Sequence, residues 1–246
     1  MEVQQQRANR GARYHLTEST SFYASAGTAY LPATNDFKFV QPSTTRVDNP
    51  GLNPETSTTY EIGMNNRLDI GALRTALFHT DYKDKITLGT DSASGKRQWQ
   101  NVAVVKVDGL EIAYQGDLGH GWRPYANYSY TRARDYATPG APGTESLRVA
   151  PHKLNAGLTY APADAWSATL NARRVSGLYF NDLTQAQWAD GYTQIDAKIS
   201  AKLPVQGNKW EAFVAANNLT DRKYQPFNIG EWSDGRTFTV GVNGRF

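Results

Sequence analysis

The sequence predicts an all-β fold, an antiparallel transmembrane β-barrel with about eleven strands in this chain. Three observations support this. Apolar and polar residues alternate with a period of two, as in strands that have one apolar and one polar face. The connections alternate between short and long. The mean hydropathy is polar, at −0.60, yet the chain has 14 Tyr and 6 Trp, as expected of a barrel with a wet lumen and aromatic girdles.

The alternation defines the individual strands. From Trp166 to Ala172 every second residue is apolar, while Ser167, Thr169 and Asn171 fall on the opposite face. The same division predicts strands at about 7–16, 21–30, 56–68, 71–86, 98–117, 122–134, 147–160, 165–179, 191–203, 209–218 and 235–246. We assign all of residues 1–246 to a single barrel domain. Within it, residues 1–20 show the weakest alternation.

The connections predict the topology. Short ones lie at 17–20, 69–70, 119–121, 162–164 and 204–208, and long ones at 31–55, 87–97, 135–146, 180–190 and 219–234. This order places all short turns on one rim, as in outer-membrane barrels, which have short periplasmic turns and longer external loops. The last strand then runs inward, and so does the first of eleven. An even-stranded barrel with both ends in the periplasm cannot start there. We therefore expect the C-terminal half of a 22-stranded barrel, the size of plugged outer-membrane transporters.

The aromatic residues fall into two groups. Trp122, Trp166 and Trp210 each begin a strand after a short turn, where a periplasmic girdle is expected. Other aromatic residues lie in or beside long loops, where they either face the substrate or form an upper girdle. Together with two neighbouring cations, the candidate substrate-facing residues are Lys96, Arg97, Trp99, Tyr179, Trp188 and Trp232. A cationic, aromatic loop favours anionic ferric chelates, although a solvated loop explains the same residues.

The sequence also excludes several classes of function. With no cysteine, it has no disulfide, thiolate metal site or cysteine nucleophile. Its four histidines lack the spacing of a helical metal pair, and it contains no phosphate-binding or nucleophile motif. No basic cluster indicates a nucleic-acid partner. The sequence therefore predicts no catalytic, metal or cofactor site, and a protein that is not an enzyme.

Five stretches carry a family resemblance. They are NPGLNPETSTTYEIG at 49–63, ALFHTDYKDKI at 76–86, NVAVVKVDGLE at 101–111, NNLTDRKY at 217–224, and Gly235-Arg236 followed by alternation to Phe246. In order and spacing they resemble the barrel of the TonB-dependent outer-membrane receptors. We expect mainly structural roles for the motif residues, because most are turn-forming or loop-entry types. These residues are Pro54, Glu55, Tyr60, Glu61, Gly63, Asn217, Leu219, Asp221, Tyr224 and Phe246.

The resemblance implies a location, a function and partners. It implies a bacterial outer-membrane protein, surrounded by lipid, that imports a ferric siderophore or a cobalamin-like nutrient. Energy would come from the TonB complex through an N-terminal region that has no counterpart here, since neither the plug nor the TonB-contacting segment is matched. The terminal Phe246 resembles the signal that the barrel assembly machinery recognises.

The alternation assigns the residues of the lumen wall, and two rival functions stay open. The wall positions facing water are Glu61, Glu111, Arg123, Tyr125 and Arg173, and Gly63 and Gly109 are expected to relieve crowding or mark bulges. One rival is a complete small outer-membrane pore or barrel enzyme. The other is a soluble β-sandwich binding module.

Overall fold

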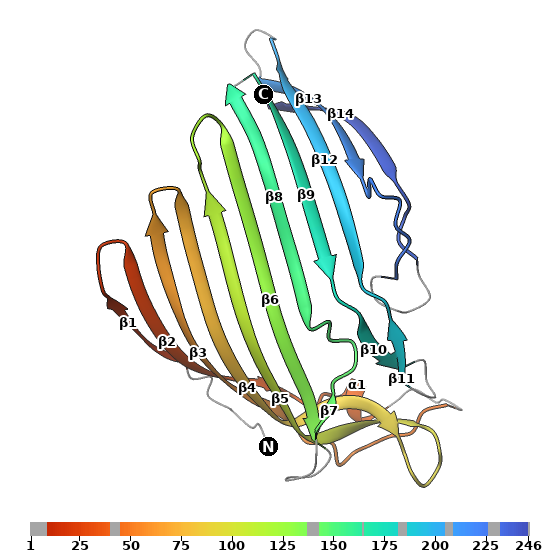
Figure 1. Ribbon diagram of the computed structural model, residues 1–246. Helices are drawn as coiled ribbons and strands as arrows, with labels where there is room; N and C mark the ends of the chain where they lie inside the picture. The colour runs from red at the N-terminus through yellow and green to blue at the C-terminus, as the bar shows by residue number, and fades with distance from the viewer. Residues whose placement is uncertain are drawn as a thin grey trace.

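The computed structural model describes residues 9–39, 45–136, 143–163, 165–181, 186–204, 209–225 and 232–245. Eleven long strands form one continuous antiparallel sheet, in which each strand pairs with the next long strand along the chain (Figure 1). These strands are β1 (Asn9–His15), β2 (Thr20–Leu31), β3 (Glu55–Leu68), β4 (Gly71–Thr90), β5 (Arg97–Gly116), β6 (Trp122–Tyr136), β8 (His152–Ala163), β9 (Trp166–Val175), β12 (Tyr192–Leu203), β13 (Lys209–Asn217) and β14 (Thr237–Arg245). The predicted number of long strands and their antiparallel order along the chain are confirmed.

The connections also follow the predicted order. All short turns lie on one rim of the sheet, which we call the short-turn rim, and all long connections lie on the other, the long-loop rim (Figure 1). The largest difference concerns β4 and β5, which continue as a twisted hairpin beyond the neighbouring strands. The loop predicted at 87–97 is therefore reduced to a turn at 91–96.

The long-loop rim contains small elements that the alternation did not predict. They are a four-residue helix, α1 (Asn35–Lys38), a short strand β7 (Thr144–Glu145) beside β6, and the hairpin of β10 (Leu178–Asn181) and β11 (Ala186–Ala189). The strand predicted at 165–179 stops at Val175, and its last residues belong to β10 instead. Segments this short contain too few residues for a period of two to be recognised.

The ladder register divides the sheet into an apolar and a polar face. Ile62, Leu77 and Leu110 are cross-strand neighbours on the apolar face. On β4 the sequence left open which face is apolar, because both Leu77 and Phe78 are large and apolar. The structure places Phe78 on the polar face, where its ring lies over the backbone of Gly109.

Five aromatic residues cover a glycine directly opposite in the ladder. In each case an added Cβ would collide with the aromatic ring. The pairs are Tyr23 with Gly63, Phe78 with Gly109, Tyr125 with Gly157, Phe213 with Gly241, and Trp210 with Gly244. Such pairs shield glycine backbone and fix the register of curved sheets. Gly63 and Gly109 therefore relieve crowding, and neither lies at a register shift.

The sheet has very little internal core. Among the described residues only seven apolar side chains are buried, and most of these are small. Large apolar side chains on the apolar face are exposed instead, including Ile199 at 59% and Leu170 at 53%. A soluble β-sandwich would cover such a face with a second sheet. In the part of the chain that the structure describes, the only other sheet is the small β10–β11 hairpin.

The apolar face ends in aromatic side chains at the short-turn rim. The rings of Trp122 and Tyr160 are 4.2 Å apart, and those of Tyr160 and Trp166 are 5.6 Å apart. Trp210 lies on the same face, opposite Leu203. Amphipathic rings in a row at one edge of an apolar band are typical of a membrane interface. No helix in the described ranges has the length and apolar character needed to cross a membrane.

Candidate functional site: the polar wall and the long-loop rim

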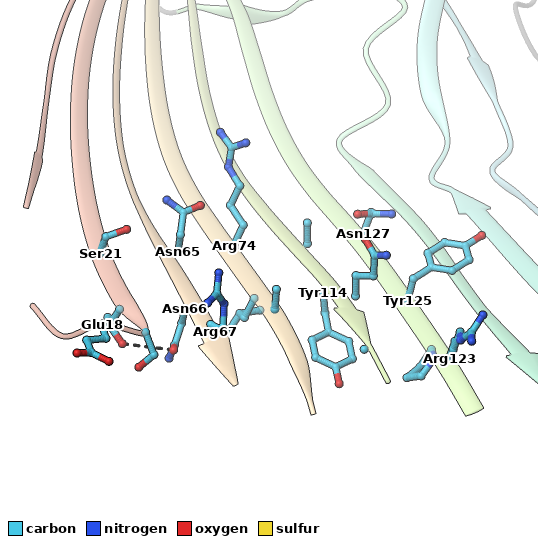
Figure 2. Close-up of a pocket in the computed structure, with 18 of the residues that line it drawn as sticks. Glu18, Ser21, Asn65, Asn66, Arg67, Arg74, Tyr114, Arg123, Tyr125 and Asn127 are labelled. Carbon is cyan, nitrogen blue, oxygen red and sulfur yellow. Dashed lines mark hydrogen bonds between the residues drawn. The ribbon is translucent and has the colours of Figure 1, made fainter. Parts of the chain in front are cut away.

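The polar wall is a continuous surface built by the inward residues of every long strand. Near the short-turn rim it lines an open hollow of about 860 Å³ (Figure 2). Arg74 lines this hollow, and beside it the Tyr23 hydroxyl donates a hydrogen bond to Glu61 Oε1 at 2.6 Å, while Arg74 Nη2 donates to Tyr23 Oη at 3.2 Å. Arg74 and Glu61 also form an ion pair at 3.7 Å. This network ties three adjacent strands together on the watery side of the sheet.

The five predicted wall residues all lie on this polar face. Arg123 approaches Asp117 at 3.9 Å, and the Tyr125 hydroxyl donates to Asn171 Oδ1 at 3.1 Å. The Arg173 guanidinium lies 5.9 Å from the centre of the Tyr192 ring. Glu61 is in the network above, and Glu111 is opposite Ala76 on the same face. The wall thus presents charged and amide groups, as expected of a surface that contacts water or a polar domain.

The β4–β5 hairpin carries Lys96, Arg97 and Trp99, and it is tied to the long segment after β2. Trp99 packs edge to face against Phe37 of α1, with ring centres 5.0 Å apart. Asn49 Nδ2 donates to the Trp99 carbonyl at 2.8 Å. Within the described residues no hydrogen bond or ion pair involves the Lys96 ammonium, whereas Arg97 Nη2 donates to the Leu88 carbonyl at 3.1 Å. The Lys96 ammonium is thus unengaged within the described residues, and the Arg97 guanidinium has a structural contact.

Two family-motif stretches meet at this hairpin, which the sequence did not predict. Asn101 Oδ1 accepts from the Asn53 amide at 2.8 Å, and Asn101 Nδ2 donates to the Asn53 carbonyl at 3.0 Å. Glu55 Oε2 accepts from the Ile86 amide at 3.0 Å, and Pro54 lies between these two contacts. The two asparagines are 48 residues apart, so no local pattern could have paired them.

The β10–β11 hairpin brings together two of the predicted aromatic residues. The rings of Tyr179 and Trp188 meet edge to face at 4.9 Å. The hairpin is held to the rim by the Arg148 amide, which donates to the Tyr179 carbonyl at 2.6 Å. Together with Tyr130 and Arg132 of β6, the two rings line a hollow of about 350 Å³.

The NNLTDRKY stretch forms a hydrogen-bonded loop at the end of β13. Asn218 is 3% exposed and has a positive φ of 52°. Its Nδ2 donates to the carbonyls of Arg222 and Asp234 at 2.9 and 3.1 Å, and its Oδ1 accepts from the Arg222 amide at 3.0 Å. Asp221 Oδ1 accepts from the Arg236 amide at 2.8 Å. These contacts join residues 218–222 to residues 234–236, at the two ends of this loop.

The loop is also anchored to β12. The Leu219 amide donates to the Ile195 carbonyl at 2.8 Å. The Tyr224 ring stacks on Tyr192 with centres 3.7 Å apart, and its hydroxyl donates to Gln194 Oε1. Burial in this stack raises the pKa of the Tyr224 phenol above its usual value. At the other side of the loop base, Asn217 Nδ2 lies 3.4 Å from the Thr237 hydroxyl.

The candidate substrate-facing residues form separate groups. Lys96, Arg97 and Trp99 share one hairpin, and Tyr179 and Trp188 share another. Trp232 is 64% exposed in the loop 218–236. Within the described ranges no hydrogen bond, ion pair or ring contact joins the three groups. Phe246 lies outside the described residues.

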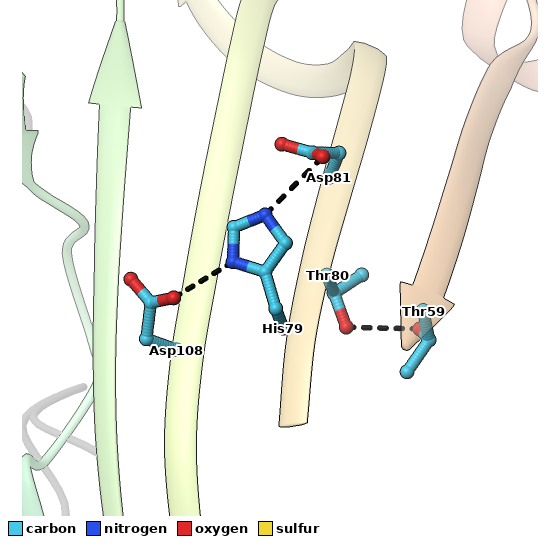
Figure 3. A network of polar contacts seen from close by, with 5 residues as sticks. All are labelled: Thr59, His79, Thr80, Asp81 and Asp108. Atoms are coloured by element: carbon cyan, nitrogen blue, oxygen red, sulfur yellow. Dashed lines mark hydrogen bonds and ion pairs between the residues drawn. The ribbon is translucent and has the colours of Figure 1, made fainter. Parts of the chain in front are cut away.

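His79 belongs to a polar cluster that the sequence did not single out (Figure 3). Its Nδ1 is 2.7 Å from Asp108 Oδ1 and its Nε2 is 3.2 Å from Asp81 Oδ2. Both ring nitrogens are thus occupied, and no metal-binding group of side chains is found among the described residues. The cluster lies on the apolar face, opposite to the face that carries the Thr59–Thr80 hydrogen bond. It is beside Tyr60, toward the long-loop rim.

Comparisons with known proteins identify the family. The family described as "TonB dependent receptor-like, beta-barrel" matches residues 9–219. A probable TonB-dependent siderophore receptor, PiuA of Acinetobacter baumannii, is 25% identical over 96% of this chain and 33% of its own length. The vitamin B12 transporter BtuB of Vibrio vulnificus is 24% identical over 97% of this chain and 37% of its own length. The chain therefore spans about a third of the length of these two relatives.

A solved structure shows the same fold. The ferric-catecholate import receptor Fiu from K12 E. coli superimposes with a TM-score of 0.73 and 22% identity over 96% of this chain and 34% of Fiu. This similarity shows the fold, that of an antiparallel outer-membrane barrel. The chain belongs to the TonB-dependent receptor β-barrel family, and is a part of such a barrel in the outer membrane.

Proposed function

We propose that this chain forms part of the barrel wall and external mouth of a receptor that imports a ferric siderophore or a similar bulky nutrient. The observation that carries the proposal is the two-faced sheet of eleven strands with all long connections on one rim. In such a barrel the apolar face contacts lipid, the polar face surrounds the transport path, and the long loops face outward. The names of the relatives support import, not catalysis.

The β4–β5 hairpin supports an anionic ferric chelate as the ligand. Lys96 has a free ammonium within the described structure, and the Trp99 indole lies three residues away on the same hairpin. A hairpin that carries both a cation and an aromatic ring can attract anionic, aromatic chelates through charge and stacking. Trp232, Tyr179 and Trp188 would extend this surface around the mouth. A cobalamin-like ligand is the alternative that the uptake assay below distinguishes.

The partners follow from the same proposal. Lipid covers the apolar face, the TonB complex supplies energy through a domain outside this chain, and the assembly machinery recognises Phe246. No cofactor or enzymatic activity is proposed. The isolated chain would leave β1 and β14 as unpaired edges in lipid, where unsatisfied backbone groups are costly. We therefore expect transport only from a barrel in which further strands cover both edges.

Uptake of labelled iron tests the proposal. The receptor containing this chain would be produced in cells lacking their own receptors, and uptake of ferric catecholates and of cobalamin measured with and without TonB. We expect TonB-dependent uptake of a ferric chelate and a reduced affinity in the Lys96→Ala variant. Lys83→Ala, an exposed lysine of β4 opposite Thr56, is the matched control. Uptake that persists without TonB, or passage of small solutes without selectivity, would refute the proposal.

A further inference from the structure

Buried apolar side chains gather at one place on the long-loop rim, around Tyr192, the first residue of β12 (Figure 1). Val175, the last residue of β9, is its ladder partner, and Ala150 comes from the connection before β8. Leu178 of β10 and Tyr224 of the connection after β13 pack against these three. We call the five residues the rim cluster. Three long connections therefore meet at one set of apolar contacts.

The rim cluster lies on the polar face of the sheet. Val175 is opposite Lys153 on β8, and Lys153 is opposite Ser129 on β6. Ser129 is in turn opposite Glu111, one of the wall residues. Residues directly opposite each other in an antiparallel ladder share a face. The three connections thus meet above the polar wall, on the side of the sheet where a transported ligand would pass.

Tyr224 connects the rim cluster to Trp232. Its ring stacks on Tyr192 with an angle of 8° between the ring planes, and its hydroxyl donates to Gln194 Oε1. The Ser233 amide donates to the Tyr224 carbonyl at 2.8 Å, and the Tyr224 amide donates to Ser233 Oγ at 3.2 Å. Since Ser233 directly follows Trp232, the place of this indole depends on where the Tyr224 ring is held.

Leu178 connects the rim cluster to the Tyr179–Trp188 ring pair. Leu178 directly precedes Tyr179 on β10. On its other side is Gly177, where an added Cβ would come within 2.2 Å of the Trp188 ring. The Trp188 indole therefore packs on backbone next to Leu178. Both rings of the pair are thus within two residues of a side chain in the rim cluster.

The β4–β5 hairpin is held in another way. It is joined to residues 45–53 by hydrogen bonds, and none of its residues belongs to the rim cluster. The mouth therefore has two separately supported parts in the described structure. One carries Lys96 and Trp99. The other carries the exposed rings of Tyr179, Trp188 and Trp232.

We propose that the rim cluster positions Tyr179, Trp188 and Trp232 as one ligand-contacting unit, independent of the β4–β5 hairpin. Side chains packed in one cluster shift together, because removing one of them leaves a space that the others must fill. Three rings held in fixed relative positions suit a planar, aromatic part of a chelate. The contact with a ligand rests on the proposed function, whereas the coupling between the connections does not.

Hydrogen exchange in the intact receptor that contains this chain tests the coupling. Tyr224→Ala removes a ring from the rim cluster, and we expect exchange about tenfold faster at Tyr179 and Trp188, which belong to a different connection. Exchange in the turn at 91–96 should not change. Lys223→Ala, at an exposed neighbour of Tyr224, is the matched control and should change neither. Tyr224→Phe keeps the stacked ring and should remain close to the wild type.

The converse variant is Leu178→Ala. It should accelerate exchange at the Leu219 amide, which β12 holds through the Ile195 carbonyl. Heat-dependent mobility in gels shows which variants form the barrel, and if one of the two does not, the other decides. Unchanged exchange on the other connection would overturn the proposal. Equal acceleration in the turn at 91–96 would also overturn it, since it would show a general loss of stability.

Binding of a ferric catecholate tests the ligand-contacting role. We expect Trp188→Ala and Tyr224→Ala each to weaken binding, and the double variant to bind at least about threefold more tightly than two independent losses predict. Lys96→Ala combined with Tyr224→Ala should give independent losses. Independent losses in the first pair would overturn the shared positioning. A receptor that binds no ferric catecholate would refute the proposed function for this ligand, and the exchange measurements would then decide the coupling alone.

Discussion

The ring of Phe78 on β4 lies over Gly109, its direct ladder partner on β5, in the space that a side chain at residue 109 would occupy. The pair explains why an apolar aromatic residue points toward the watery face. It covers glycine backbone in the middle part of the β4–β5 ladder, and so helps to set the register of the longest ladder in the sheet.

Gly109→Val should destabilise the barrel by about 1–3 kcal/mol, because the added methyl groups collide with the Phe78 ring. The denaturant midpoint of the folded barrel measures this change. Ala113→Val, on the same strand and face, is the control and should have little effect. Exchanging the pair, with Phe78→Gly and Gly109→Phe together, should recover much of the stability. If the exchanged pair is no more stable than Gly109→Val alone, the contact does not have this role.

Leu170→Arg should destabilise the barrel by about 2–4 kcal/mol, the cost of an arginine near the middle of the lipid face. Leu170 lies midway along β9 on the apolar face, between Leu158 and Ala197. Asn171→Arg places the same charge one residue away on the polar face and should be tolerated. Unfolding in lipid vesicles compares the two. A reversed order of stabilities would contradict the assignment of the faces.

Asn218→Ala should loosen the loop 218–236 at a cost of about 1–3 kcal/mol, because it leaves the carbonyls of Arg222 and Asp234 without their donor. Limited proteolysis of intact cells should then cut this loop first. Asn217→Ala removes only a long, exposed contact to Thr237 and should remain resistant. Equal cleavage of the two variants would show that the buried amide does not hold the loop.

Acid should open the turn at 91–96 before the rest of the hairpin. Asp91 accepts hydrogen bonds from the Ser94 hydroxyl at 2.6 Å and the Ser94 amide at 2.8 Å, and these lower the pKa of its carboxyl. Because the folded turn lowers the pKa of the Asp91 carboxyl, the turn is stabilised at every pH above the pKa that this group has in the unfolded chain. This stabilisation is lost as the pH falls below about 4. Hydrogen exchange at the Ser94 amide should therefore accelerate in acid relative to the expected intrinsic rate. In Asp91→Asn the excess acceleration should disappear.

The strands could be predicted from the sequence because each has its own local pattern. Alternation in residues such as Trp166 to Ala172 reveals both the strand and its faces. The pattern fails at Phe78, whose orientation depends on a glycine 31 positions away. The contacts of the candidate site could be predicted least. Two examples are the Asn53–Asn101 pair and the hollow shared by Tyr179 and Arg132. Both depend on how the long connections fold back over the sheet, and the alternation of residues along a strand gives no information about that.

The reciprocal asparagine contact has a consequence for the mouth of the barrel. The Val47 amide donates to the Arg97 carbonyl, and the Arg97 amide donates to the Thr45 carbonyl. With Asn53 joined to Asn101, residues 45–53 and the β4–β5 hairpin are hydrogen-bonded at several points, and we expect them to move together. If the two segments move, we expect the backbone to bend near Asp84, where the β4–β5 pairing is interrupted and φ is positive at 55°.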